Sequence, residues 1–319
     1  MLTLLRRYGT LVGFVAILMF FSISLPDTFM TTRNWLNISQ QMSMLIVVAS
    51  GMTIVMVMGD FDLSVGSMAS LAGIVAAILF TFDYPIWAAV SVALLVGLAG
   101  GAINGLLISF IGILPFVATL ATLTMLSGAA FVVSGGKTIS GRAIPEAFGN
   151  FAREGLALGD WAGGASLPNL TIVALIVAGV VWVLLEQTTF GRRLYAIGGN
   201  IEAAHLSGVP VKRLKLLAFS LTGGAAALAG IMYASRVASA NPTQGSGLML
   251  NAIAAVFLGS TLSEHGEPRL LYTIVGVLVL GVLDNGLTQL NVDSYVRQIL
   301  VGGIIVLAVS TSSYARRLH

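Results

Sequence analysis

The sequence predicts an all-α protein: a polytopic transmembrane helical bundle of about ten spans with cytoplasmic N- and C-termini. Of its 319 residues, 57% are hydrophobic and only 9% are charged, and the mean hydropathy is +0.95. A soluble domain carries about a quarter of its residues as Asp, Glu, Lys or Arg. The chain therefore lacks the polar surface that water requires, and a lipid bilayer is its expected solvent.

Apolar runs recur at the length that a membrane-crossing helix needs. Such a helix takes about 20 residues, because it rises about 1.5 Å per residue through about 30 Å of hydrocarbon. The runs cover 8–25, 40–58, 64–81, 86–109, 115–134, 169–186, 215–235, 248–262, 270–290 and 297–312. The eighth run is short. The first run also fits a cleaved signal peptide, which would leave nine spans.

Positive charge orients the bundle. Short cytoplasmic loops collect Lys and Arg, and the basic residues are densest at both termini and in the 187–215 loop. The sequence therefore places both ends and this loop inside, and the 135–168 loop outside. No segment resembles a soluble domain, so residues 1–319 form one transmembrane domain. The Gly-rich 135–168 loop is expected to hold about one turn of interfacial helix around 144–153.

The sequence offers no catalytic or cofactor-binding motif. Gly136-Lys137-Thr138 resembles the end of a phosphate-binding loop, but Phe131 stands where that motif requires Gly. With no cysteine and three scattered histidines, the chain is expected to be no enzyme and to bind no metal or cofactor itself. Its basic residues are explained by membrane topology, and no nucleic-acid partner is expected.

An acidic turn separates the second and third apolar runs. Gly59 is suited to end one helix, and Asp62 or Ser64 to cap the next. A carboxylate at the centre of a membrane helix costs about 2.5–3.5 kcal/mol, so Asp60 and Asp62 need water, partners or a helix terminus. Two interpretations stay open: a plain cytoplasmic turn, or a broken helix beside a water-filled pathway.

Other polar residues interrupt the apolar runs. The residues assigned to a possible pathway or gate are Asp60, Phe61, Asp62, Ser64, Asn104, Asn251 and Asn285. Interhelical hydrogen bonding would explain any one of them. A separate pattern, Gly97, Gly101 and Gly105 at steps of four, lets helix backbones approach closely; packing within one subunit is the expected use, and a subunit interface the alternative.

The 187–215 loop carries the most specific pattern. Asn200 is a good N-cap, Glu202 suits the first helical turn, and Pro210 ends the segment. A helix of about two turns therefore lies between two spans, and Gly208 leaves bare backbone at its end. Such a helix, flanked by basic residues, is a docking element for a cytosolic partner.

These residues resemble a known family. Glu202-Ala203-Ala204 followed by Gly208 resembles the coupling loop of ABC importer permeases. The strings 190–192 and 196–200 look like the ribose, xylose and galactose branch, and 59–66 is similar to that branch's Gly-Gly-Ile-Asp-Leu-Ser-Val-Gly signature. Segments 115–120 and 252–256 also match, so the resemblance covers nearly the whole chain.

The resemblance implies a permease subunit in the bacterial inner membrane that forms the pathway for a monosaccharide or similar polyol. It implies as partners a second permease chain, in a homodimer or heterodimer, a cytosolic ABC ATPase that binds the ATP and Mg²⁺, and an external substrate-binding protein. The coupling residues would be Asn200, Glu202, Ala203, Ala204, Leu206 and Gly208.

Three departures from the family pattern stand out. Asp60 replaces its second Gly, Asn251 stands where Asp is usual, and 259–268 replaces a Gly-rich stretch with a charged one. An alternative function is a proton-coupled secondary transporter with Asp60, Asp62 and Asp284 as its relay. The coupling loop argues against this alternative, because such a carrier needs no ATPase dock.

Overall fold

The computed structural model describes residues 2–159, 164–263, 265–303 and 306. These residues are mostly helical, which confirms the all-α prediction. The helices are α1 (Leu2–Ser24), α2 (Thr32–Met56), α3 (Val65–Thr81), α4 (Ile86–Leu106), α5 (Pro115–Ser134), α6 (Glu146–Arg153), α7 (Asn169–Trp182), α8 (Thr189–Gly199), α9 (Ile201–Leu206), α10 (Val211–Val237), α11 (Ser246–Ser260) and α12 (Leu270–Gln289). A further helical segment covers 294–303.

Apolar helices coincide with nine of the ten predicted runs. Among the described residues, six helices are long and apolar enough to cross a membrane. They are α2, α4 with its π-helical extension (Ile86–Ile111), α5, α7 with a similar extension (Asn169–Gln187), α10 and α12. Gly9–Ser24, α3 and α11 are apolar but shorter. The tenth run, 297–312, lies largely outside the described residues.

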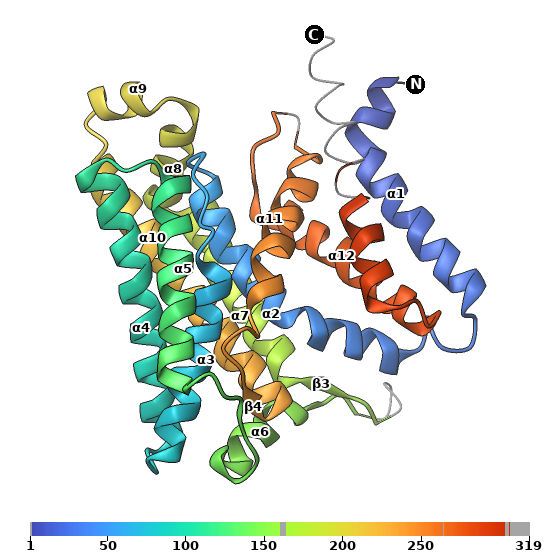
Figure 1. Cartoon of the computed structure of the whole chain (residues 1–319). Helices are drawn as coiled ribbons and strands as arrows, with labels where there is room; N and C mark the ends of the chain where they lie inside the picture. The colour runs from blue at the N-terminus through green and yellow to red at the C-terminus, as the bar shows by residue number, and fades with distance from the viewer. Residues whose placement is uncertain (1, 160–163, 264, 304–305, 307–319) are drawn as a thin grey trace.

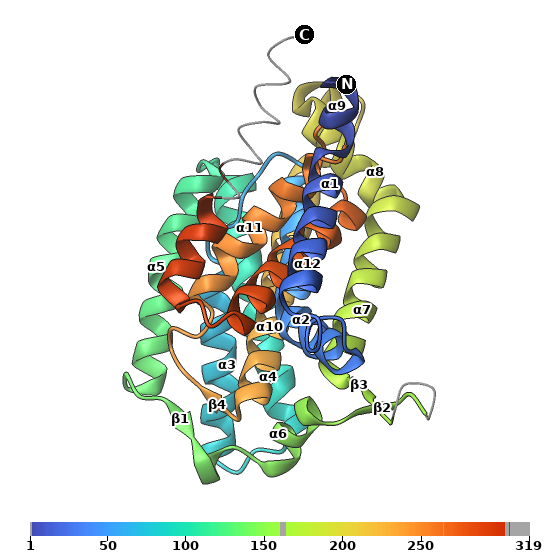
Figure 2. The same cartoon turned by 90° about the vertical axis from the view of Figure 1, so that its right-hand side faces the viewer.

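Helix α10 lies at the centre of the bundle, where it packs against α2, α3 and α4. Figure 1 shows α8 and α9 together at one end, here called the coupling end, and α6 at the opposite end, here called the loop end. Figure 2 shows α1, α11 and α12 on one side of the bundle. Helix α1 begins at the coupling end in both views, as expected if the N-terminus and the 187–215 loop share one side of the membrane.

The glycine pattern in α4 serves packing within the subunit, as expected. A β-carbon at Gly97 would overlap Ala227 and the Gly223 carbonyl of α10, and one at Gly101 would overlap the Phe219 carbonyl. The two backbones are therefore in contact. Hydrogen bonds add to this packing: the Ser220 hydroxyl donates to the Leu98 carbonyl at 2.9 Å.

Some predicted boundaries and loops were wrong. Helix α2 begins at Thr32 rather than at 40, because Thr31 caps it by accepting a hydrogen bond from the Asn34 backbone N–H at 3.2 Å. The helix expected around 144–153 is present as α6, although it has about two turns rather than one. The 135–168 loop also contains short strands, which the sequence did not predict. These are β1 (Ile139–Ser140), which pairs with β4 (Ser239–Ala240), and β2 (Gly155–Ala157), which pairs with β3 (Ser166–Pro168). Both pairs are antiparallel.

Candidate functional site

The predicted coupling helix is present as α9, and its N-cap is confirmed. Asn200 adopts an extended backbone conformation, and its Oδ1 accepts a hydrogen bond from the Ala203 N–H at 2.9 Å. Glu202 lies in the first turn, and Gly208 follows the helix at φ +79°. Ala204 is buried, whereas 86% of the Leu206 surface is exposed. Leu206 thus gives α9 a large exposed apolar side chain, and α9 itself lies at the coupling end of the bundle (Figure 1).

Helix α8, which the sequence did not predict, connects α9 to the bundle. Leu194 and Ile197 are buried in the core, and Gly198 lies so close to Val57 that a β-carbon would overlap the Val57 carbonyl. Helix α8 therefore packs directly against the end of α2, where the acidic turn begins.

Tyr195 on α8 links the coupling loop to the divergent 259–268 segment. Its hydroxyl lies 3.1 Å from the Glu186 carboxylate and 3.3 Å from the Pro268 carbonyl. Burial, followed by the adjacent Glu186 charge, raises the pKa of Tyr195 above its ordinary value. The phenol stays protonated and can act as a hydrogen-bond donor.

In the acidic turn, Asp60 pairs with a lysine of α10. Lys215 Nζ lies 2.7 Å from Asp60 Oδ2, and the two side chains are only 12% and 10% exposed. Gly59, at φ +81°, provides the left-handed conformation that follows the end of α2. The pair thus joins the α2–α3 turn to the first part of α10.

Asp62 is buried and has hydrogen-bond partners but no ion pair among the described residues. Its Oδ1 accepts from the Ser64 N–H at 2.9 Å and from the Ser64 hydroxyl at 2.6 Å. Asn104 of α4 donates to the Ser64 hydroxyl at 2.9 Å. The carboxylate therefore fixes the Ser64 backbone that enters α3. The predicted side-chain cap of α3 is not formed, because Ser64 is the N-cap residue and its side chain makes no cap bond, while Asp62 bonds only to Ser64 itself.

A cavity of about 440 Å³ lies beside α9 and the start of α10. Glu202, His205 and Leu206 line one part of it, and Lys212 and Lys215 another. The lysine that pairs with Asp60 therefore borders the coupling helix as well. Lys215 thus lies between α9, with which it lines the cavity, and Asp60 of the acidic turn, with which it pairs.

The remaining residues assigned to a pathway lie elsewhere. Asn251 lines a second cavity of about 750 Å³, together with Asp284. Asn285 is buried and accepts a hydrogen bond from Gln289 at 2.8 Å. Phe61 packs against Phe257 of α11, with ring centroids 5.9 Å apart. The structure thus separates the predicted set. Asp60, Phe61, Asp62 and Ser64 form the acidic turn with Asn104 nearby, Asn251 lines a distinct and mostly apolar cavity, and Asn285 lines neither.

Comparison with known proteins identifies the family. The family described as "Branched-chain amino acid transport system / permease component" matches residues 34–309. The ribose import permease protein RbsC of Bacillus subtilis is 39% identical over 305 residues, which cover 96% of this chain and 92% of the relative. The chain belongs to this permease family.

Two other relatives of this permease have a similar coverage. RbsC of Escherichia coli K12 is 38% identical over 314 residues, covering 95% of each chain. The L-arabinose transport system permease protein AraH of the same strain is 36% identical over 311 residues, covering 98% of this chain and 92% of the relative. No solved structure matches the permease. The resemblance to ABC importer permeases is thereby confirmed, and the chain is a multi-pass membrane component.

The three aspartates of the alternative proton relay do not form one group in this permease. Asp60 and Asp62 belong to the α2–α3 turn, whereas Asp284 lies on α12, where it pairs with Arg297 at 2.8 Å. Two of the three thus have cationic partners. The geometry gives the relay no support.

The sequence did not indicate that basic residues take part in the acidic turn or in the cavity that contains Asp284. Lys215, Arg236 and Arg297 entered the prediction only as topology signals. Lys215 pairs with Asp60, and Arg297 pairs with Asp284. Arg236 lines the same cavity as Asp284. These neighbours belong to other segments of the chain, so no local pattern indicates the role of each cation. The one available signal was that Asp60 replaces a family glycine, because a new buried carboxylate requires a partner.

Proposed function

We propose that this permease forms the translocation pathway for a monosaccharide or similar polyol in an ABC importer of the bacterial inner membrane. It would work with a second permease chain, a cytosolic ATPase and an external substrate-binding protein. The relatives' names support the substrate class, since they are ribose and L-arabinose permeases. ATP and Mg²⁺ would bind to the ATPase, so the permease needs no cofactor of its own.

The observation that carries this proposal is the exposed apolar surface of α9. Leu206 and Ile201 are both exposed, and basic residues flank the helix at Arg192, Arg193 and Lys212. Charge on both sides keeps this segment out of the hydrocarbon. Ile201 and Leu206 border the same cavity, and a contiguous apolar patch that neither lipid nor the bundle covers favours a protein interface. The ATPase is the partner that fits a coupling loop on the cytoplasmic side.

Purification of the permease with its ATPase in mild detergent tests this assignment. Leu206→Ala should reduce the amount of bound ATPase, because burial of a leucine is worth about 1.5–3 kcal/mol. Glu202→Lys should have a similar effect by reversing the charge in the first turn of α9. Leu95→Ala on α4, where the leucine is 62% exposed, is the matched control and should bind ATPase normally.

Uptake in vesicles supplies the second readout. Sugar uptake should require ATP and persist when the proton gradient is collapsed. Uptake that continues without ATP and follows the gradient would instead support the secondary transporter. Normal ATPase binding and normal uptake by both α9 variants would exclude α9 as the docking element.

A further inference from the structure

The cavity of about 750 Å³ has the composition of a small-molecule site. It is bounded by α2, the last turns of α10, the start of α11, α12 and the 294–303 segment. Its volume falls within the range of about 300–1,000 Å³ found for ligand sites. Most of its lining is apolar, and a few polar groups converge on it: Gln41, Tyr233, Arg236, Asn251, Asp284 and Arg297.

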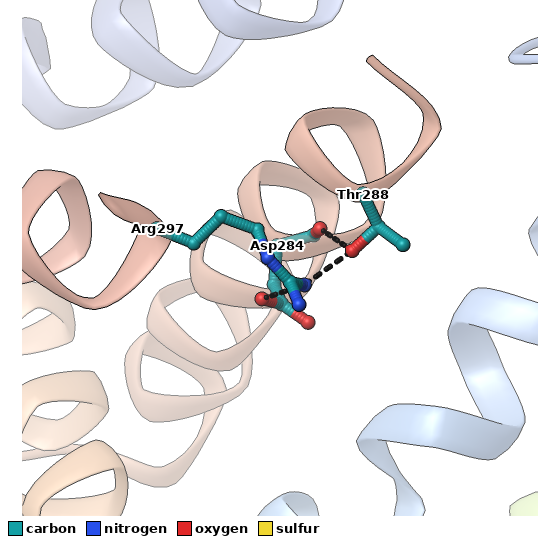
Figure 3. A network of polar contacts seen from close by, with 3 residues as sticks. All are labelled: Asp284, Thr288 and Arg297. Carbon is teal, nitrogen blue, oxygen red and sulfur yellow. Dashed lines mark hydrogen bonds and ion pairs between the residues drawn. The ribbon is translucent and has the colours of Figure 1, made fainter. Parts of the chain in front are cut away.

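Two residues of the cavity lining, Asp284 and Arg297, form an ion pair. Figure 3 shows this pair together with Thr288. Arg297 donates to Asp284 Oδ1 at 2.8 Å and also contacts the Thr288 hydroxyl. The Thr288 hydroxyl in turn donates to the Asp284 carbonyl at 2.6 Å. The guanidinium is thereby fixed beside the carboxylate by two residues of α12.

The pair remains accessible to a ligand. The Asp284 side chain is 53% exposed, and the Arg297 side chain is 21% exposed. Only Oδ1 of the carboxylate bonds to Arg297, so Oδ2 is available as an acceptor. An ion pair this exposed contributes about 0–1 kcal/mol to stability. Stability therefore does not explain why two charges line this cavity, and ionisable residues within membrane bundles usually mark a substrate path.

Further donors and acceptors face the same cavity without protein partners. Within the described ranges, Arg236, Asn251 and Gln41 form no side-chain hydrogen bond or ion pair, and Tyr233 adds an aromatic face. A sugar hydroxyl both donates and accepts, so it can bridge a carboxylate and a guanidinium. A ring of hydroxyls thus matches these groups, because each hydroxyl can donate to Asp284 or accept from Arg236 and Arg297.

We propose that this cavity is a transit site for a neutral sugar or polyol, and that the Asp284–Arg297 pair recognises the configuration of its hydroxyls. Asp284 accepts from one hydroxyl, Arg297 donates to its neighbour, and Arg236 and Asn251 contact the rest of the ring. This inference rests on the proposed function and adds a second point of selection, within the membrane, to that of the external binding protein.

Direct binding tests the site apart from ATP-driven transport. Saturation-transfer NMR with D-ribose and L-arabinose on the detergent-solubilised permease should detect binding of at least one sugar to the wild type. Asp284→Asn and Arg297→Gln keep the side-chain shape, remove the charge and should weaken binding about tenfold, as expected for a lost hydrogen bond to a charged group. Asp293→Asn is the matched control, because Asp293 is exposed and bonds to Tyr295 outside the cavity.

Uptake by the assembled importer in vesicles supplies the selectivity readout. Asp284→Asn and Arg297→Gln should raise the KM and change the ratio of D-ribose to L-arabinose uptake, while thermal stability and ATPase binding match those of Asp293→Asn. A purely structural pair would change stability and leave the ratio unaltered. No sugar binding by the wild type, a preference for a sugar acid, or an unchanged KM and ratio in both variants would overturn the proposal. Failure of the proposed function would appear differently, as wild-type uptake that does not depend on ATP.

Discussion

The sequence and the structure predict different effects on stability when Asp60 is replaced by Gly. Because Gly is the usual family residue at this position, the sequence alone predicts that Asp60→Gly is tolerated. The structure predicts a cost, because Asp60 is the partner of Lys215 at 2.7 Å. Removing the carboxylate would leave a cation with 12% of its side chain exposed and without its counter-charge.

The loss in free energy of unfolding depends on how far the Lys215 ammonium can reach solvent once Asp60 is removed. Removing one partner of a fully buried ion pair costs about 3–5 kcal/mol. Lys215 also lines the cavity of about 440 Å³ beside α9, and a flexible lysine stem can move its ammonium towards such a space. We therefore expect a smaller loss, about 2 kcal/mol, which corresponds to a fall in Tm of about 3 °C for a chain of this length.

Thermal unfolding of the purified permease in detergent measures this loss. Asp60→Gly combined with Lys215→Leu should recover most of the Tm, since replacing a buried pair by apolar residues is often neutral. Asp27→Gly, in an exposed turn, controls for the backbone effect of glycine. Equal melting of Asp60→Gly and Asp27→Gly, with no recovery in the double variant, would refute the reasoning.

Two further predictions concern the neighbouring aspartate and the orientation of the bundle. Asp62→Asn should retain stability and uptake, because Asn Oδ1 can accept the same two bonds from Ser64, while Asp62→Ala should lose about 1–2 kcal/mol with those bonds. A large loss of uptake in a stable Asp62→Asn protein would instead show that the charge itself is needed. Cysteines placed at Ser207 and Ser140 should react with an impermeant reagent only from the cytoplasmic and the external side respectively, and the reverse pattern would invert the topology.

The sequence predicted the elements that depend on local patterns. Apolar runs located the membrane helices, and Asn200 with Glu202 located the start of α9, because caps and hydrophobic length act within a few residues. Helix α8 was missed, since it is short and its Arg192 and Arg193 suggested a loop. The β1–β4 pair was missed because it joins residues about a hundred positions apart.

The candidate site shows the same difference between features set by local sequence and features set by tertiary contacts. Asp62 and Ser64 were both expected at the start of α3, where they lie, but they bond to each other rather than capping the helix. The sequence grouped Asn251 with Asp60, yet the structure places them in different environments, because polarity within an apolar run does not indicate which helices meet. Pairing of Asp60 with Lys215 and of Asp284 with Arg297 depends on how α2, α10 and α12 pack. Only the assembled bundle contains that information.

These pairings also bear on orientation. The prediction of cytoplasmic termini counted every Lys and Arg near a helix end, but charges that serve an ion pair or a cavity inside the bundle report less on topology. In the predicted topology, Lys215 lies on the cytoplasmic side, whereas Arg236 and Arg297 lie on the external side. Setting these aside removes one positive charge inside and two outside, so the positive-inside bias becomes stronger. The structural roles of these cations therefore favour the orientation that places α9 in the cytoplasm, where an ATPase can reach Leu206.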